Sequence, residues 1–211
     1  MPTILRCKVL VVGNAAVGKS AMTSVFHTEG ASFPKNYGMT IGGEFIVKQV
    51  PVPSSASSSG SQSLFDEPAV QQSAQQKQQQ QQTSVEMYVF DLAGQEIYRD
   101  LVKQYMVGAN MVVFVYDPTN PDSFRDLPQW IEMVTPFLPR GEVRGALVST
   151  KGDLEARAVV KQQDGMAFAK HHNLKFFSVS TKENKGIDSV FSSLAADYYS
   201  LFDEAIKSFL H

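Results

Sequence analysis

The sequence contains a single cysteine, Cys7, among its 211 residues, which rules out an internal disulfide framework and is typical of a reducing compartment. No apolar run approaches the roughly 18 residues that a membrane span needs. The amino terminus lacks the apolar core of a signal peptide, and Pro2 excludes the N-myristoylation pattern. The chain ends in IKSFLH, without a cysteine for prenylation. We therefore expect a soluble protein without a lipid anchor of its own.

The sequence also lacks a strong excess of either charge. It has 19 Lys and Arg against 21 Asp and Glu, a formal net charge of −2. Because no basic footprint is present, nucleic-acid binding has little support. In contrast, 43% of the residues are hydrophobic, which suits one cytosolic globular domain with a substantial core.

Short apolar or β-branched runs recur along the chain, and several are apolar almost throughout, as strands buried on both faces of a parallel sheet must be. They lie at residues 4–12, 43–50, 85–92, 110–117, 145–150 and 174–180. Segments with helical spacing lie between them, at residues 20–29, 123–138, 164–173 and 186–211. The alternation predicts an α/β fold with a mostly parallel six-stranded sheet and helices on both faces. In such a sheet, ligands bind at the carboxyl ends of the strands.

The helix expected at 123–138 has an apolar stripe that includes Trp130, a residue that we expect in the core. Asp122 or Ser123 is the expected cap at its start. The segment at 51–84 is different, because it is rich in Ser, Pro and Gln and has almost no core formers. We predict a disordered insertion between the second and third strands, which pair as a hairpin; the alternative is a partner-binding or phosphorylated tract.

The stretch GNAAVGKS, residues 13–20, fits the pattern G-x-x-x-x-G-K-[ST] and stands between a predicted strand and a predicted helix. Its two glycines let the backbone wrap closely around a phosphate, and the N–H groups of residues 15–20 point inward. Lys19 reaches the β- and γ-phosphates, and the Ser20 hydroxyl ligates Mg²⁺. The alternative is a glycine-rich turn with a solvent-exposed lysine. The pattern and its context favour binding of a nucleoside triphosphate.

The stretch FDLAGQE, residues 90–96, ends the third predicted strand. Asp91 is placed to hold a water molecule on the magnesium ion, and Gly94 can turn its N–H toward a γ-phosphate. Gln95 can orient an attacking water and is therefore the candidate catalytic residue. Upstream, MTIGGEF supplies Thr40, whose hydroxyl can close over Mg²⁺ and the γ-phosphate.

Two further motifs, STKGDL at 149–154 and SVSTK at 178–182, end the fifth and sixth predicted strands. Asp153 can accept two hydrogen bonds from the N1 and N2 edge of guanine, a pattern that adenine does not offer. The aliphatic stem of Lys151 can lie along the base while its ammonium stays in water. The second motif offers loop N–H groups to the guanine oxygen, from Ser180, Thr181 and Lys182.

The order GNAAVGKS, MTIG, DLAGQE, TKGD and STK resembles that of the Ras-superfamily small GTPases, and TIGGEF is similar to the Rab branch. The resemblance covers residues 4–200 apart from the insertion. It implies that Phe33 stacks against the guanine and that Tyr37 covers the phosphates. It also implies nucleotide contacts along the phosphate loop and at the base loop, from Ala15, Ala16, Val17, Gly18, Ala21 and Thr150.

Four stretches resemble the Rab-like GTPase subunits of the intraflagellar transport B complex. They are RCKVLVVGNAAVGKSAM, EGASFPKNYGMTIGG, VKQVPVP and YYSLFDEAIKSF. This resemblance implies a GTP-binding protein that hydrolyses GTP slowly and uses Mg²⁺. It implies a stable partnership with a small all-β intraflagellar transport subunit (intraflagellar transport protein 25 type) and with other complex B proteins. It places the protein in the cytoplasm and in the cilium or flagellum. That family also lacks a prenylated tail.

Four positions bear on the expected rate and affinity. Thr150 stands where most small GTPases have asparagine, although the Rho branch also uses threonine. Threonine keeps the hydroxyl but lacks the amide that ties the base loop to the phosphate loop, so we expect a modest nucleotide affinity. Ala15 and Ala16 stand where Ras has glycines, and a methyl group at Ala15 can crowd the γ-phosphate. Gln95 is present, although some members of the intraflagellar family lack it. The alternatives are a constitutive scaffold that binds GTP without cycling, a vesicle-trafficking Rab-like switch and, with less support, a P-loop kinase or ATPase.

The last predicted helix continues past the usual end of the small-GTPase fold, over residues 200–211. Its apolar stripe either packs on the body of the protein or docks a partner. The stripe consists of Phe202, Ala205, Ile206, Phe209 and Leu210.

Overall fold

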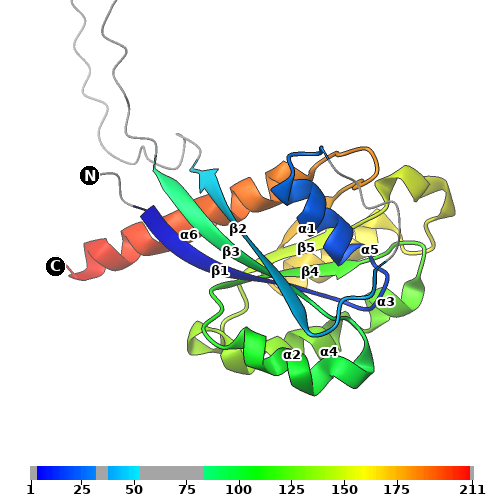
Figure 1. Cartoon of the computed structure of the whole chain (residues 1–211), viewed down its shortest axis with the longest axis horizontal. Coiled ribbons are helices and arrows are strands. Elements are labelled where there is room, and N and C mark those ends of the chain that lie inside the picture. The colour runs from blue at the N-terminus through cyan, green and yellow to red at the C-terminus, as the bar shows by residue number, and fades with distance from the viewer. Residues whose placement is uncertain (1–3, 32–37, 53–82, 210–211) are drawn as a thin grey trace, which may run out of the picture.

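Six strands form one sheet in the order β2-β3-β1-β4-β5-β6 in the computed structural model, which describes residues 4–31, 38–52 and 83–209 (Figure 1). β2 pairs antiparallel with β3, and the other neighbouring strands are parallel. The predicted mostly parallel sheet and the β2–β3 hairpin pairing are therefore confirmed. The strands are β1 (Ile4–Val12), β2 (Gly43–Pro51), β3 (Ser84–Leu92), β4 (Met111–Tyr116), β5 (Gly145–Ser149) and β6 (Lys175–Ser178).

Helices cover both faces of this sheet (Figure 1). Alternate residues of β1 face opposite ways: Val9 and Val11 pack with α1 and α6, whereas Leu10 and Val12 pack with α2, α4 and α5. This alternation follows from the two-residue period of a strand, and it gives the protein two cores. The helices are α1 (Lys19–His27), α2 (Arg99–Met106), α3 (Pro121–Arg125), α4 (Leu127–Val134), α5 (Gln162–His171) and α6 (Ile187–Phe209).

The segment expected to form one helix at 123–138 is instead divided into α3 and α4 at Asp126. Pro128 has no N–H, so a continuous helix would lose a hydrogen bond at that point. The expected cap was also wrong, because the side chain of Asn120 accepts from the backbone N–H of Asp122 and caps α3. Trp130 is buried in the core as predicted. α2 has no counterpart among the predicted helices.

The two ends of α6 differ in burial. Phe191 and Leu194, in its first half, are fully buried, and Phe191 stacks on Phe26 of α1 with ring centroids 3.7 Å apart. Further along, Phe202 and Ile206 are 37% and 41% exposed. The helix therefore packs on the protein's own body over its first half and projects an apolar stripe beyond it. Leu210 lies outside the described residues.

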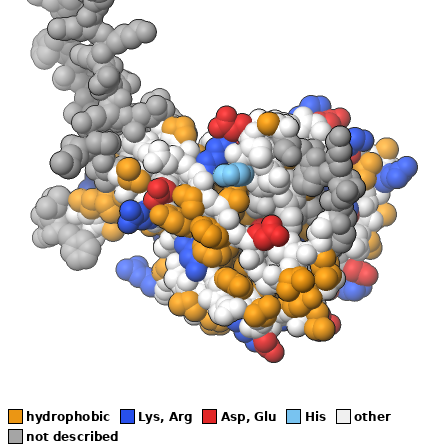
Figure 2. Space-filling model, in the orientation of Figure 1, with side chains coloured by type: hydrophobic (Ala, Val, Ile, Leu, Met, Phe, Trp, Pro, Cys, Tyr) orange, Lys and Arg blue, Asp and Glu red, His pale blue; other side chains and the backbone are white. Residues whose placement is uncertain are grey.

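An edge strand and a central strand show opposite burial. Every residue of β4, in the middle of the sheet, is buried. β2 lies at the edge and leaves Phe45 and Val47 60% and 38% exposed. Hydrophobic side chains gather in several patches among charged ones on the face shown in Figure 2.

Among the described helices, none is both long enough and apolar enough to span a membrane. Most of the predicted insertion, residues 53–82, lies outside the described residues.

Candidate guanine-nucleotide site

The loop that joins β1 to α1 holds residues 13–18 in a tight turn. Gly13 has φ of +145°, and a Cβ atom there would lie 2.1 Å from the carbonyl oxygen of Val115 on β4, so only glycine fits. Gly18 has φ of +99° and is the N-cap of α1. This left-handed cap turns the chain into the helix, so that backbone N–H groups at the positive end of α1 are directed at one point. The loop geometry suits a bound phosphate.

Lys19 curls back across this loop. Its ammonium donates to the carbonyl oxygens of Gly13 at 2.9 Å and Asn14 at 2.8 Å, and the residue is only 6% exposed. Burial lowers the pKa of Lys19 to about 8, and the nearby Asp91 carboxylate partly opposes that shift. A cation held beside the backbone N–H groups at the start of α1 is well placed to bind an anion.

Three oxygen-bearing side chains predicted to serve a metal ion come together beside Lys19. The hydroxyls of Ser20 and Thr40 lie 3.0 Å apart, and Thr40 lies 3.5 Å from a carboxylate oxygen of Asp91. The other oxygen, Asp91 Oδ1, is buried and has no hydrogen-bond partner among the described residues. Burial raises the pKa of Asp91 to about 6, against the opposing effects of Ser20 and Lys19. Hydroxyls and one carboxylate suit Mg²⁺, which keeps waters and shares its shell with phosphates.

Gly94 packs directly on the phosphate loop. A Cβ atom at this position would lie 2.4 Å from the carbonyl oxygen of Gly13 and 2.5 Å from the nitrogen of Ala15. The close approach explains why glycine follows β3 here and brings the backbone of Gly94 to the loop. Gln95, next in the chain, is half-buried at the start of a 3₁₀ turn, Glu96–Tyr98.

On the opposite side of the loop, Thr150 connects the base motif to the phosphate loop. Its hydroxyl donates to the carbonyl oxygen of Val17 at 2.6 Å and also lies 3.0 Å from the carbonyl oxygen of Tyr116. Thr150 is only 1% exposed. The absence of an amide at this position therefore leaves the two loops connected, because the threonine hydroxyl reaches the loop carbonyl.

The two remaining base motifs meet at Asp153. The hydroxyl of Ser180 donates to Asp153 Oδ1 at 2.9 Å, and the backbone N–H of Gly152 donates to Val179. Ser180 and Lys185 form an isolated β-bridge that closes the loop after β6, which also contains Thr181 and Lys182. One carboxylate oxygen is thus fixed by the protein, and the other can accept from a base.

Asn14, the second residue of the phosphate-loop motif, was not among the predicted site residues. Its side chain accepts from the indole N–H of Trp130 at 2.8 Å and donates to Asp126 at 2.7 Å. The loop is thereby tied to the junction of α3 and α4. A buried indole N–H usually has a partner, which is the one signal that could have pointed to this contact.

Most of the predicted site residues lie on connections beside the carboxyl ends of β1, β3, β5 and β6, and Thr40 precedes β2. Val17 and Gly18 lie in the loop, and Ala21 lies in the first turn of α1. Ala16 has φ of +62°, a left-handed conformation. The predictions for Phe33 and Tyr37 concern residues outside the described part of the chain.

Comparison with known proteins agrees with this architecture. The family model described as Ras family matches residues 8–60 and 61–200. The chain is 30% identical over 205 residues to the Intraflagellar transport protein 27 homolog of Homo sapiens, covering 97% of this chain and 96% of that protein. It is 32% identical over 209 residues to Intraflagellar transport protein 27 of Chlamydomonas reinhardtii, covering 97% and 90%.

A Rab protein is also similar. The chain is 29% identical over 188 residues to Ras-related protein Rab-30 of Homo sapiens, covering 89% of this chain and 77% of that protein. The matches extend over nearly the whole chain, and the structure has the expected mostly parallel sheet and a tight loop after β1 beside the paired hydroxyls of Ser20 and Thr40. The chain therefore belongs to the Ras family of small GTPases, and its resemblance to Rab-like intraflagellar transport proteins is supported over almost its full length.

Proposed function

We propose that this chain is a Rab-like GTP-binding subunit of an intraflagellar transport B complex that binds GTP with Mg²⁺ and hydrolyses it slowly. The observation that carries the proposal is the convergence of Lys19, Ser20, Thr40 and Asp91 on one loop, together with the connection of Asp153 to Ser180 across the base loops. The family assignment makes GTP hydrolysis the general expectation.

Each residue has a distinct role in the proposed reaction. The backbone N–H groups of the phosphate loop and the Lys19 ammonium hold the phosphates and stabilise the charge that develops on them. Ser20 and Thr40 would hold Mg²⁺ directly and Asp91 would hold it through water; the bound ion neutralises phosphate charge. The N–H of Gly94 holds the γ-phosphate, and Gln95 orients the attacking water.

The slow rate is attributed to Ala15. Its backbone nitrogen lies against Gly94, and we propose that its methyl group crowds the γ-phosphate. A methyl group there restricts the approach of water or of an arginine supplied by an activating protein. Thr150 contributes less to this expectation, because its hydroxyl retains a hydrogen bond to the loop.

The assignment to intraflagellar transport depends on the relatives that carry that name. We propose that the protein acts in the cytoplasm and the cilium or flagellum, as a stable partner of a small all-β subunit of the intraflagellar transport protein 25 type and of other complex B proteins. A single GTPase domain with an inserted loop at 51–84 and a helical extension at 200–211 completes the proposed organisation. The exposed apolar stripe at Phe202 and Ile206 supports partner docking at the extension.

Nucleotide binding tests the first part. Purified protein should bind a fluorescently labelled GTP or GDP analogue in the presence of Mg²⁺. ATP should displace the analogue only at a far higher concentration than GTP does. Equal displacement by ATP and GTP would remove the guanine assignment. Single-turnover hydrolysis of wild type and Gln95→Leu then tests the reaction. If both are equally inert, with and without cell extract, the chain is a scaffold that does not cycle.

Affinity purification tests the second part. The tagged chain is loaded with GDP or with a non-hydrolysable GTP analogue, and the proteins that bind are identified. Recovery of the same ciliary transport components in both states supports a structural subunit, whereas recovery with GTP alone supports a switch. Recovery of vesicle-tethering proteins instead would favour a vesicle-trafficking Rab.

A further inference from the structure

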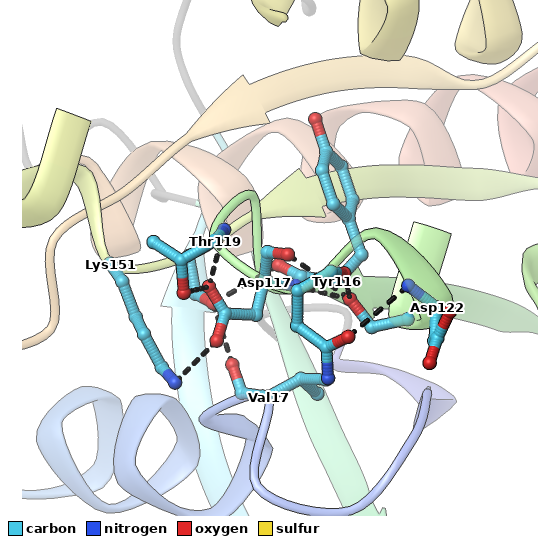
Figure 3. Close-up of polar contacts among 9 residues, drawn as sticks. Val17, Tyr116, Asp117, Thr119, Asp122 and Lys151 are labelled. Atoms are coloured by element: carbon cyan, nitrogen blue, oxygen red, sulfur yellow. Dashed lines mark hydrogen bonds and ion pairs between the residues drawn. The ribbon is translucent and has the colours of Figure 1, made fainter. Parts of the chain in front are cut away.

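Asp117 directly follows β4 and is held in place from several sides (Figure 3). Its carboxylate Oδ1 accepts from the backbone N–H of Thr119 at 2.9 Å and from the Thr119 hydroxyl at 2.7 Å. Its own N–H donates to the Ser123 hydroxyl at 3.0 Å. The residue is 5% exposed. The carboxylate is therefore a fixed acceptor at the carboxyl end of the sheet.

The second carboxylate oxygen of Asp117 accepts from the ammonium of Lys151 at 2.5 Å. Lys151 follows β5, the strand next to β4, and its backbone is left-handed, with φ of 54°. A left-handed turn is rare for a residue with a side chain, and here it directs the lysine across the strand ends toward Asp117 (Figure 3). The pairing connects β4 to the base loop independently of Thr150.

We propose that Asp117 is a positioning residue for the guanine. Asp117 holds the Lys151 ammonium, so that the lysine stem stays extended as a flat apolar surface for the base. The inference rests on the proposed function, because it assigns a role within the same nucleotide site. The side chain of Asp117 bonds to Thr119 and Lys151, so we assign it no direct contact with the base or the phosphates. Its effect passes through Lys151 alone.

The electrostatics support a permanent pairing. Burial on its own would raise the pKa of Asp117, but the hydrogen bonds from Lys151 and Thr119 outweigh it, and the pKa lies below its ordinary value. Asp117 therefore carries its charge throughout the neutral range. The side chain of Lys151 is 34% exposed, so without this partner it would be free to leave the strand ends for water.

The test is the dissociation rate of a fluorescent GDP from the Mg²⁺-loaded full chain. Asp117→Asn keeps the shape and an acceptor for Thr119 but removes the charge that holds Lys151. Dissociation should become about tenfold faster, the loss expected for one hydrogen bond to a charged group. GTP should be affected equally, because the change lies at the base end. The control is Asp197→Asn, which breaks the Lys175–Asp197 pair at the opposite end of the sheet and should leave the rate unchanged.

A double-mutant comparison separates positioning from a general structural effect. Lys151→Met keeps an unbranched stem of similar length without the ammonium. If Asp117 acts through Lys151, adding Asp117→Asn to Lys151→Met should change the rate by less than twofold. An equal tenfold change in both backgrounds would overturn the proposal, because it would show that Asp117 acts elsewhere.

A second variant covers the case in which Asp117→Asn does not fold. Thr119→Val leaves the carboxylate charged but removes the hydroxyl that orients it, and it should speed dissociation about threefold in wild type and not in Lys151→Met. Equal effects in the two backgrounds would again overturn the proposal.

If wild type fails to bind guanine nucleotides, or ATP competes equally, the proposed function itself fails. If wild type binds selectively and neither variant changes dissociation, only the role of Asp117 is lost.

Discussion

The phosphate side of the site occupies one continuous loop, residues 13–20, whereas the base side is assembled from the ends of three strands. In the loop, most of the groups expected to meet the ligand are backbone N–H groups whose directions are set by Gly13 and Gly18, joined by the side chains of Lys19 and Ser20. On the base side, loop N–H groups after β6 are joined by side chains that depend on other residues: the Asp153 carboxylate is held by Ser180, and Thr150 ties the base loop to Val17.

This difference determines how each side can fail. Backbone donors survive most side-chain changes, so the phosphate side is disturbed mainly through its conformation. The base side depends on pairs, and removing one partner leaves a buried polar group unsatisfied. Substitutions on the base side should therefore change selectivity and dissociation with little change in phosphate binding, and the predictions below test this division.

The largest effect is expected for Asp153→Asn. The amide can still accept from Ser180, but it offers a donor to the base where the carboxylate accepts. Guanine affinity should fall by about 10⁴-fold, the discrimination typical of a site whose hydrogen bonds are left unpaired. The concentration of inorganic pyrophosphate that displaces a labelled nucleotide still bound to the variant, relative to that nucleotide's own Kd, should be unchanged. Glu155→Gln, an exposed neighbour on the same turn, is the matched control and should bind GDP like wild type.

The next prediction concerns Cys7, which is fully buried on the strand that leads into the phosphate loop. Thiol labelling of the native protein requires opening of β1, so GDP at 100 times its Kd should slow labelling about a hundredfold. Asp153→Asn should lose this protection at the same GDP concentration. Labelling at the rate of a free thiol in the presence of GDP would show that β1 opens without release of the nucleotide.

The same cysteine gives a pH dependence with a defined sign. Burial raises the pKa of Cys7 from 9.0 to about 12. Since the folded state keeps a proton that the unfolded chain releases, the contribution of this thiol to stability falls as pH rises from about 9 toward 12. Cys7→Ala should remove that component from the denaturation midpoint measured across this range. An identical pH dependence in the two proteins would contradict it.

Thr150→Val should have an intermediate effect. Valine keeps the shape but removes the only donor in this side chain, leaving the carbonyl of Val17 without its 2.6 Å partner. The free energy of unfolding should fall by about 1–3 kcal/mol, and GDP dissociation should accelerate. Thr150→Ser retains the hydroxyl and is the control. If valine and serine behave alike in chemical denaturation, the hydroxyl does not connect the two sides.

Most of the fold could be predicted because its signals are local. Near-continuous apolar runs predicted all six strands, and β1 begins and ends where expected, at Ile4–Val12. α2 was missed because it is short and only Val102 and Met106 are buried on it. The break between α3 and α4 was missed because its apolar stripe continues across Asp126, and a stripe reports burial and not continuity of the backbone.

In the candidate site too, the features with a local sequence signal could be predicted and the contacts between distant residues could not. The phosphate loop is recognisable from eight adjacent residues, whereas the role of Asn14 depends on Trp130, which is far away in the chain. Asp117 has no motif of its own, and its partner Lys151 lies 34 residues further on. Contacts of this kind depend on which strand ends become neighbours, and that is a property of the sheet order.

The smallest effect is expected at Ala16, where the phosphate side has a residue with φ of +62°. A left-handed alanine costs about 1 kcal/mol or more, and glycine removes that cost. Glycine also adds about 0.4–1 kcal/mol of entropy to the unfolded chain, so the two terms largely offset each other. Ala16→Gly should therefore change the free energy of unfolding by less than about 1 kcal/mol. Ala21→Gly, in the first turn of α1, lacks the strain and should lose about 0.5–1 kcal/mol. If both variants are destabilised equally, the left-handed turn at Ala16 carries no strain. The backbone conformation of the phosphate loop would then depend as little on its side chains as its backbone N–H donors do.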